Sequence, residues 1–293
     1  MILSGTIVKG IAGFYYVEAG GAVYECKARG VFKNEKMKPY VGDEVDIDIS
    51  DDTPVVVRIH ERKNEFLRPP VANVEQFVIV SAMTYPEPNL PVIDKFLAMA
   101  ELKGVDAVLC FTKVDLVSEK KISEMRAVYS SIYPVAFIDA KDESSVQDLV
   151  PYLFEKKSAL AGPSGVGKST ILGALRRDTS IQTGAISEKT KRGRHTTRHV
   201  ELFSLDFGGK VFDTPGFTSF DVPDIGEDEL QFLFPDIERY TGQCKFGSGC
   251  RHTGEPGCAV CEAVEKGEIH KLRYDSYLSQ LAEIREREKR KYQ

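Results

Sequence analysis

The chain has 293 residues, of which 42% are hydrophobic, so it is long enough to form two or three domains with separate cores. Its formal net charge of -5 excludes a surface that is positively charged throughout, although local basic stretches can still bind nucleic acid. No apolar run reaches the roughly 20 residues that span a bilayer, and the start, MILSGTIVKG, lacks a secretory leader. We therefore expect a soluble, cytoplasmic protein without a membrane partner.

Residues 1–66 alternate apolar and polar side chains with a period of two residues. The alternation occurs in five stretches separated by glycine and charged turns: 5–10, 13–19, 22–30, 43–49 and 53–60. Short strands without a helical period predict a β-barrel, and five of them fit an OB-fold, which often binds oligonucleotides. The fold alone does not establish that this barrel binds anything.

Residues 67–222 have a different sequence pattern, in which continuous apolar runs alternate with stretches of helical periodicity. The helical stretches include 92–104 and 123–133, and the predicted strands are 76–83, 106–113, 135–140, 158–162, 199–207 and 209–216. Buried strands interleaved with helices predict an α/β domain with a mostly parallel sheet. After this the chain becomes acidic, then cysteine-rich, then helical, so residues 223–293 are predicted to form a third, mainly helical domain.

A phosphate-binding loop is predicted between the strand at 158–162 and a following helix. Gly162, Gly167, Lys168 and Ser169 match G-x-x-x-x-G-K-[ST] in that context. Backbone N–H groups would surround the β-phosphate, Lys168 would add positive charge, and the Ser169 hydroxyl would ligate Mg²⁺. The predicted phosphate-contacting residues are Gly162, Pro163, Ser164, Gly165, Val166, Gly167, Lys168, Ser169 and Thr170.

Two further segments complete a predicted triphosphate site. Asp213 and Gly216 form D-x-x-G, where the carboxylate can hold Mg²⁺ and the glycine N–H can contact the γ-phosphate. Between this motif and the phosphate loop lies GRHTT, which offers Thr196 or Thr197 as a switch residue; we favour Thr197. The predicted Mg²⁺ ligands are Ser169, Thr197 and Asp213.

The stretch FTKVD at 111–115 predicts that the base is guanine. The Asp115 carboxylate can accept hydrogen bonds from N1–H and the exocyclic amine of guanine, whereas adenine has no matching pair of donors. Thr112 belongs to the same motif, and the stem of Lys113 would cover the base. In IDAKD at 138–142, the Ala140 N–H can reach the guanine carbonyl oxygen.

These motifs stand in a rotated order, because the base-reading segments precede the phosphate loop and D-x-x-G. The usual order in GTPases is phosphate loop, switch threonine, D-x-x-G, then base readers. Circular permutation preserves such a site, since all the loops still emerge at the carboxyl ends of neighbouring strands. The chain then leaves the domain directly after D-x-x-G.

Four of the six cysteines lie between 244 and 261, which in a reducing compartment indicates metal binding rather than disulfides. Cys244, Cys250, His252 and Cys258 give C-x5-C-x-H-x5-C, a set suited to a closed tetrahedral Zn²⁺ site. Cys261 competes for a place, because it forms C-x-x-C with Cys258. A closed site would be structural and not catalytic.

Taken together, GPSGVGKS, GRHTT, DTPGF and PGCAV, in this permuted order, resemble the RsgA (YjeQ, YloQ) family of circularly permuted ribosome-assembly GTPases. The resemblance implies a bacterial cytoplasmic GTP hydrolase that binds the small (30S) ribosomal subunit and its 16S rRNA late in maturation. Subunit-stimulated hydrolysis would be linked to release. It also implies that the Zn²⁺ ligands are Cys244, Cys250, His252 and Cys258, which leaves Cys261 out, and that His195 positions the attacking water.

Phe217 stands directly after D-x-x-G, where many GTPases have a glutamine that orients water. Phenylalanine cannot do this, so His195 is a candidate to orient the water. With Thr197 of the switch segment and Lys168 of the phosphate loop, it makes up the predicted catalytic residues. The basic stretches 189–199 and 284–293 are expected to contact phosphates of RNA. The alternative is a nucleotide-gated RNA-binding placeholder with incidental hydrolysis; a P-loop kinase is a further alternative. We expect a monomer that binds GTP and GDP.

Overall fold

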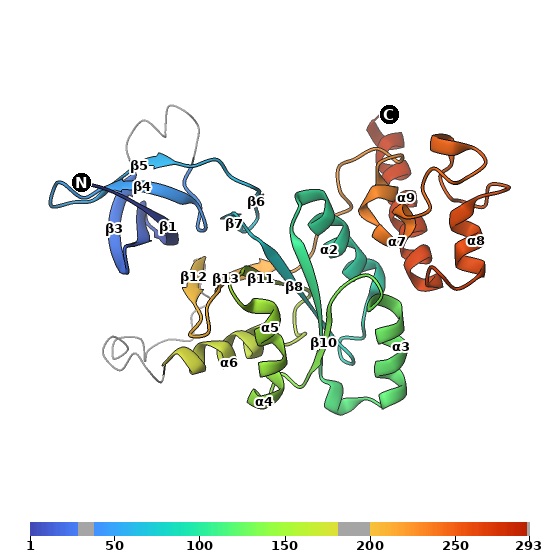
Figure 1. Ribbon diagram of the computed structural model, residues 1–293, viewed down its shortest axis with the longest axis horizontal. Coiled ribbons are helices and arrows are strands. Elements are labelled where there is room, and N and C mark those ends of the chain that lie inside the picture. The colour runs from blue at the N-terminus through green and yellow to red at the C-terminus, as the bar shows by residue number, and fades with distance from the viewer. Residues whose placement is uncertain (29–37, 181–199, 292–293) are drawn as a thin grey trace. The chain divides into compact units, whose positions relative to one another are not determined.

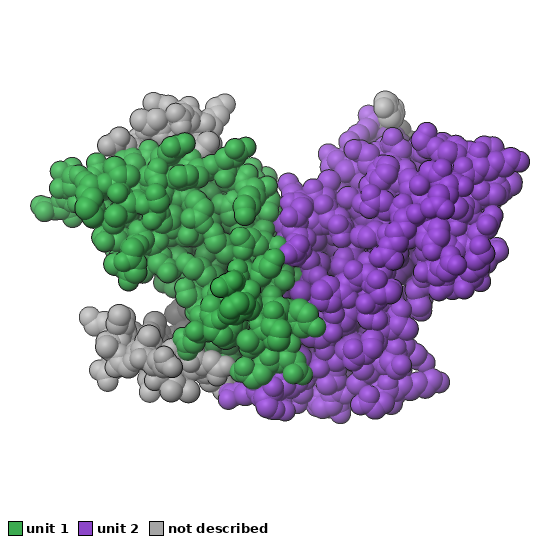
Figure 2. Space-filling model, in the orientation of Figure 1, with its two compact units in different colours: residues 1–77, 146–160, 169–217 green, residues 78–145, 161–168, 218–293 purple. Residues whose placement is uncertain are grey.

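The computed structural model describes residues 1–28, 38–180 and 200–291, and of 177–180 and 214–216 the backbone alone. These residues form two compact units, which Figure 2 distinguishes by colour. The first unit contains residues 1–77, 146–160 and 169–217, and the second contains 78–145, 161–168 and 218–293. The units do not follow the domain boundaries predicted at 66 and 222, which stay predictions.

The first five strands form the barrel that the alternating pattern predicts (Figure 1). They are β1(Ile2–Ile11), β2(Phe14–Ala19), β3(Ala22–Ala28), β4(Glu44–Asp48) and β5(Val55–Ile59). The pairings β1–β2, β2–β3, β3–β5, β5–β4 and β4–β1 close the ring, as in an OB-type barrel. Its core consists of fully buried side chains that include Ile7, Val17, Val45, Ile47 and Val56.

Strand β1 also pairs with a second group of strands in the first unit. Lys9 lies opposite Glu201 of β12(Glu201–Ser204), and β12 pairs antiparallel with β13(Lys210–Phe217). With β11(Lys157–Ala161), the strand order of this unit is β11-β13-β12-β1-β2-β3-β5-β4. The sequence predicts a barrel and a separate sheet; the structure joins them because β1 has ten residues, of which 2–6 pair with β4 while Lys9 pairs with β12.

A short hairpin of β6(Glu65–Leu67) and β7(Pro70–Ala72) follows the barrel. The sequence pattern does not predict it, because strands of three residues are too short to show a period of two. Phe66 of β6 is buried and packs edge-on against Phe77 at 5.2 Å between ring centroids. The hairpin thus supplies one ring of an aromatic cluster in this unit.

The second unit contains β9(Asp106–Thr112), β10(Val135–Ile138) and β8(Gln76–Ala82) from Val78 onward, in the order β10-β9-β8. β9 and β10 are parallel, and every residue of β8 is buried, as the continuous apolar runs predict. The connecting helices α2(Leu90–Lys103) and α3(Glu119–Tyr129) begin at Asn89 and Ser118, whose side chains accept hydrogen bonds from the first turn. The short helices α4(Glu143–Val146) and α5(Val150–Leu153) follow β10.

The end of the chain is mainly helical, as predicted, with α7(Pro235–Glu238), α8(Ala259–Glu265) and α9(Lys271–Lys291). Its buried side chains form one cluster that also includes Ala98 of α2. Its members include Leu230, Phe234, Ile237, Val260, Tyr277, Leu281 and Ile284. Among the described residues, no helix has the length and apolar character needed to cross a bilayer.

Arg273 of α9 is fully buried and binds two carboxylates from different helices. Its Nη1 donates to Asp94 of α2, while Nε and Nη2 donate to the two oxygens of Asp236 of α7 at 3.2 and 2.9 Å. The guanidinium also lies 4.7 Å from the centroid of the Phe234 ring. Burial raises the pKa of Asp94, and the Arg273 charge opposes that shift. The three charged groups therefore depend on one another.

We predict that Arg273→Met lowers the free energy of unfolding by about 3–5 kcal/mol, because removing one partner leaves buried charge uncompensated. Urea unfolding of the full chain measures this loss. Arg126→Met is the matched control, since this exposed arginine stacks on Phe137 at 4.5 Å and should matter far less. Equal losses in both variants would contradict the role assigned to Arg273.

Candidate nucleotide site and metal centre

The predicted phosphate loop, residues 162–168, connects β11 to α6(Lys168–Ser180). Gly162 has φ of 135°, and a Cβ at this position would lie 2.1 Å from the Val80 carbonyl oxygen of β8. A side chain there is excluded both by conformation and by space. The loop backbone thus lies directly against β8, and the amino end of α6 follows it, as in anion-binding loops.

The Lys168 ammonium lies within this loop, 2.5 Å from the Gly162 carbonyl oxygen and 2.6 Å from that of Pro163. The side chain is half-buried, and burial lowers the pKa of Lys168. A phosphate bound in the loop would supply the full negative charge that the two carbonyl groups lack. This position suits the predicted phosphate contact of Lys168, which stays a prediction.

The end of β9 is tied to the phosphate loop by two side chains of the T-K-x-D motif. The Thr112 hydroxyl, which is fully buried, donates to the Val166 carbonyl oxygen at 2.5 Å. The Lys113 ammonium donates to the Gly165 carbonyl oxygen at 3.0 Å and also to the carbonyl of Tyr85, in the loop after β8. The segments predicted to read the base and to bind the phosphates therefore share one local framework.

The loop after β10 meets the same framework at Gly167. A Cβ built on Gly167 would lie 3.6 Å from both the Ala140 Cβ and the Thr112 Oγ1. Asp139, which stands where many GTPases have serine, accepts a hydrogen bond from the Lys141 N–H at 2.9 Å and so closes the turn around Ala140. Three motif segments predicted from the sequence thus come together in the second unit.

Asp115 lies one turn beyond Thr112, in the 3-10 helix Val114–Leu116. Lys113 enters this turn with φ of 60°, and the Asp115 side chain is exposed. An exposed carboxylate beside the end of a strand can accept the paired donors of a guanine that covers it. The guanine contact of Asp115 stays a prediction.

The predicted Mg²⁺ residues are only partly described. Ser169 and Thr170 lie in the first turn of α6, and Asp213 and Gly216 lie in β13. The Asp213 carboxylate is 3.0 Å from the Arg176 guanidinium of α6, so β13 faces the helix that carries Ser169. No sequence motif indicates this ion pair. The residues His195, Thr196 and Thr197, with the basic stretch 189–199, lie outside the described residues.

Phe217, the residue after D-x-x-G, is fully buried. Its ring packs edge-on against Phe66 at 5.3 Å and Phe77 at 5.1 Å between centroids. The side chain is thus a core residue of the first unit. This gives a packing reason for phenylalanine at a position where a water-orienting residue is common.

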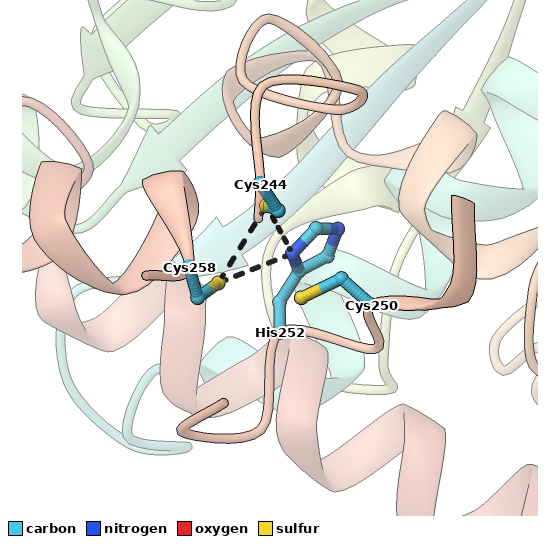
Figure 3. Close-up of side chains that lie close together, drawn as sticks. All are labelled: Cys244, Cys250, His252 and Cys258. Carbon is cyan, nitrogen blue, oxygen red and sulfur yellow. Dashed lines mark hydrogen bonds between the residues drawn. The ribbon is translucent and has the colours of Figure 1, made fainter. Parts of the chain in front are cut away.

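Four buried side chains at the end of the chain form a cluster that could hold a metal ion: Cys244, Cys250, His252 and Cys258. Figure 3 shows them converging. The Sγ atoms of Cys244 and Cys258 are 3.8 Å apart, and the His252 Nδ1 is 3.5 and 3.4 Å from them. A tetrahedral site with Zn–S of about 2.3 Å and Zn–N of about 2.0 Å requires separations of roughly 3.8 and 3.5 Å.

Cys261, the fifth candidate, lies outside this cluster. Its Sγ is 3.5 Å from the Tyr274 hydroxyl, and its N–H approaches the Cys258 Sγ at the start of α8.

Two tyrosines that belong to no sequence motif hold the loop that carries His252. Tyr274 donates to the His252 carbonyl at 2.6 Å and Tyr277 to that of Arg251 at 3.0 Å.

Burial raises the pKa of the Cys250 and Cys258 thiols and lowers that of His252. Uncharged ligands therefore suit the buried cluster in the absence of a cation. A divalent metal would deprotonate the thiols and bind the neutral imidazole, so binding would release protons.

The basic tail, predicted to contact phosphates, binds the chain itself in the structure. Arg287 donates to the carbonyl oxygens of Val222, Pro223 and Ile225 at 2.8–3.2 Å. Arg285 donates to Glu227 at 2.7 Å. These partners belong to the segment 222–231, which comes after β13, and we call it the exit segment. Spacing along a helix could not reveal partners some 60 residues away.

A phosphate loop before a helix, a T-K-x-D motif bonded to it and the rotated motif order define a circularly permuted P-loop GTPase. The RsgA GTPase model matches residues 59–223, and the RsgA N-terminal domain model matches residues 4–57. The chain belongs to the RsgA GTPase family, and it is a GTP hydrolase.

The relatives are similar over nearly the whole chain. A protein named small ribosomal subunit biogenesis GTPase RsgA from Alkaliphilus metalliredigens is 43% identical over 285 residues, 96% of this chain and 97% of the relative. A relative of the same name from Clostridium perfringens is 44% identical over 283 residues, which cover 96% of this chain and 98% of the relative.

Solved structures agree with this result. YjeQ from Thermotoga maritima has a TM-score of 0.84 and 36% identity, with 97% of this chain and 99% of that chain covered. YloQ, described as a circularly permuted GTPase, has a TM-score of 0.83 and 37% identity, with 98% and 96% covered.

We predict that Thr112→Val weakens GDP binding by roughly tenfold, because an unsatisfied buried carbonyl costs about 1–3 kcal/mol and the loop loses its support. Isothermal titration calorimetry measures the change. Thr112→Ser keeps the hydroxyl and should stay within about twofold of the wild type. Equal binding by the valine and serine variants would mean that the bond to Val166 does not support the site.

Proposed function

We propose that this chain hydrolyses GTP on the small (30S) ribosomal subunit during its late maturation, and that the subunit accelerates hydrolysis, which is linked to release. The observation that carries the proposal is the junction of Thr112, Ala140 and Gly167, which brings base-reading and phosphate-binding segments together. The names of relatives similar over 96% of the chain support the ribosomal partner. We further propose contact with 16S rRNA, a monomer, and a cytoplasmic location.

In this proposal each part of the site has a separate role. Asp115 accepts the guanine donors, Lys113 covers the base, and Thr112 and Ala140 complete the base pocket. Backbone groups from Gly162 to Thr170 surround the phosphates with the Lys168 ammonium. Ser169, Thr197 and Asp213 hold Mg²⁺, and Gly216 contacts the γ-phosphate.

Hydrolysis by the chain alone should be slow, since Phe217 is buried in an aromatic cluster and cannot orient water. We propose that His195 positions the attacking water, with Thr197 and Lys168 stabilising the charge on the γ-phosphate. A basic segment that binds both nucleotide and RNA would give the subunit a direct way to complete the site.

We propose that the Cys/His cluster holds one Zn²⁺. The donor set, the burial of all four residues and their separations suit a closed tetrahedral site. With four protein ligands there is no open position for a substrate, so the ion would stabilise the C-terminal helices and take no part in hydrolysis.

We predict that 30S subunits accelerate single-turnover hydrolysis of GTP by at least roughly tenfold, because the free chain lacks a water-orienting side chain after D-x-x-G. Release of phosphate from a pre-formed GTP complex measures the rate. His195→Ala should lose most of the acceleration but keep GDP affinity. An unchanged rate with subunits would instead support the RNA-binding placeholder.

We predict that Asp115→Asn lowers GTP affinity by roughly 100-fold or more and improves binding of XTP, whose second carbonyl matches an amide donor. Competition with a fluorescent nucleotide measures both. Asp142→Asn is the control: this exposed carboxylate accepts hydrogen bonds from Ser144 in its own turn and should leave affinity unchanged. Retained GTP preference in Asp115→Asn would remove guanine recognition from Asp115.

A further inference from the structure

Gln231 connects the exit segment to the metal cluster. We infer that it is a positioning residue, which holds the His252 ring so that Nδ1 faces the metal and which couples metal binding to the docking of the exit segment. The inference rests on the proposed metal site. Neither residue spacing nor any motif indicates Gln231, which lies 21 residues before His252.

The orientation of the Gln231 amide follows from its partners. Gln231 is buried in the 3-10 helix Leu230–Leu233, and its Nε2 donates to the Asp228 carbonyl oxygen at 2.7 Å. A backbone carbonyl can only accept, so the amide nitrogen must face Asp228 and Oε1 must face the other way. Oε1 lies 2.9 Å from the His252 Nε2 and 3.3 Å from the Thr241 hydroxyl.

The tautomer of the His252 imidazole follows from this orientation of the Gln231 amide. Because an amide oxygen only accepts, the His252 Nε2 must carry the proton, and Nδ1 must present its lone pair. That Nδ1 is the atom 3.5 Å from the Cys244 Sγ and 3.4 Å from the Cys258 Sγ. Gln231 thus selects the tautomer that can bind a metal among the thiols, a role that partners of metal-bound histidines commonly have.

The hydrogen bond between Gln231 and His252 also links the loop that carries His252 to the exit segment. The Arg251 guanidinium, one residue before His252, lies 3.5 Å from Glu227 of this segment. Arg287 and Arg285 of α9 hold its other residues through the carbonyls of 222, 223 and 225 and the Glu227 carboxylate. By linkage, a docked exit segment favours metal binding, and bound metal favours docking to the same extent.

The test compares Gln231→Leu and Gln231→Glu in the full chain by zinc competition with a chromophoric chelator. Leucine removes the acceptor at similar volume, so zinc affinity should fall roughly 10–100-fold. Glutamate keeps an oxygen for the Nε2–H but loses the donor that faces the Asp228 carbonyl, so zinc affinity should recover only in part and lie between those of the leucine variant and the wild type. Gln243→Leu is the matched control, since that exposed glutamine donates to the Arg239 carbonyl at 2.7 Å and should stay within about twofold.

A second measurement separates positioning from stability. Cobalt(II) in the wild-type site should give tetrahedral d–d bands, and these should shift in Gln231→Leu and return in Gln231→Glu. A general loss of stability would lower cobalt occupancy without moving the bands. Cobalt bands of Gln231→Leu identical to those of the wild type would overturn the inference.

The remaining outcomes are also decisive. Zinc affinity of Gln231→Leu within about twofold of the wild type overturns the inference and leaves the proposed metal site intact. A wild-type chain that binds no zinc overturns the metal site and the inference together.

Discussion

The hydrogen bond from the Thr112 hydroxyl to the Val166 carbonyl is the contact on which the nucleotide site depends. It joins chain segments 54 residues apart and fixes the phosphate loop beside the end of β9. Lys113 repeats the connection at Gly165, and Ala140 closes against Gly167. None of these contacts depends on which segment comes first in the chain. A permuted order can therefore keep the site, because the geometry is set at strand ends rather than by connectivity.

Permutation instead changes the segment that D-x-x-G leads into. Strand β13 continues directly toward the exit segment, whose backbone is held by Arg287 and whose Glu227 is held by Arg285. The exit segment is bound in turn to the loop that carries His252, through the hydrogen bond between Gln231 and His252. In the permuted order the chain therefore passes from D-x-x-G in β13 directly into the exit segment that α9 holds.

Periodicity and motif spacing in the sequence predicted most of the fold and of the candidate site. Both are patterns between nearby residues, so they could not predict contacts between distant segments. The period of two in residues 1–66 predicted the barrel, and motif spacing predicted the phosphate loop and the Cys/His cluster. The β1–β12 pairing, the Arg176–Asp213 ion pair and the Gln231–His252 bond join distant segments and leave no periodic trace. The tail shows the same limit: Arg285 and Arg287 look like a phosphate-binding stretch, but their partners are within the chain.

The C-terminal helices combine their apolar cluster with specific polar contacts that hold their shape. Arg273 binds Asp94 of α2, and Ala98 of the same helix joins their apolar cluster, so α2 supplies part of their core. The Cys/His cluster fixes the loop between α7 and α8, where glycines rather than apolar side chains prevail. A small region with a limited core needs such fixed points. Because α2 also follows β8, whose Val80 lies against Gly162, the helix that anchors the C-terminal region belongs to the framework of the phosphate loop.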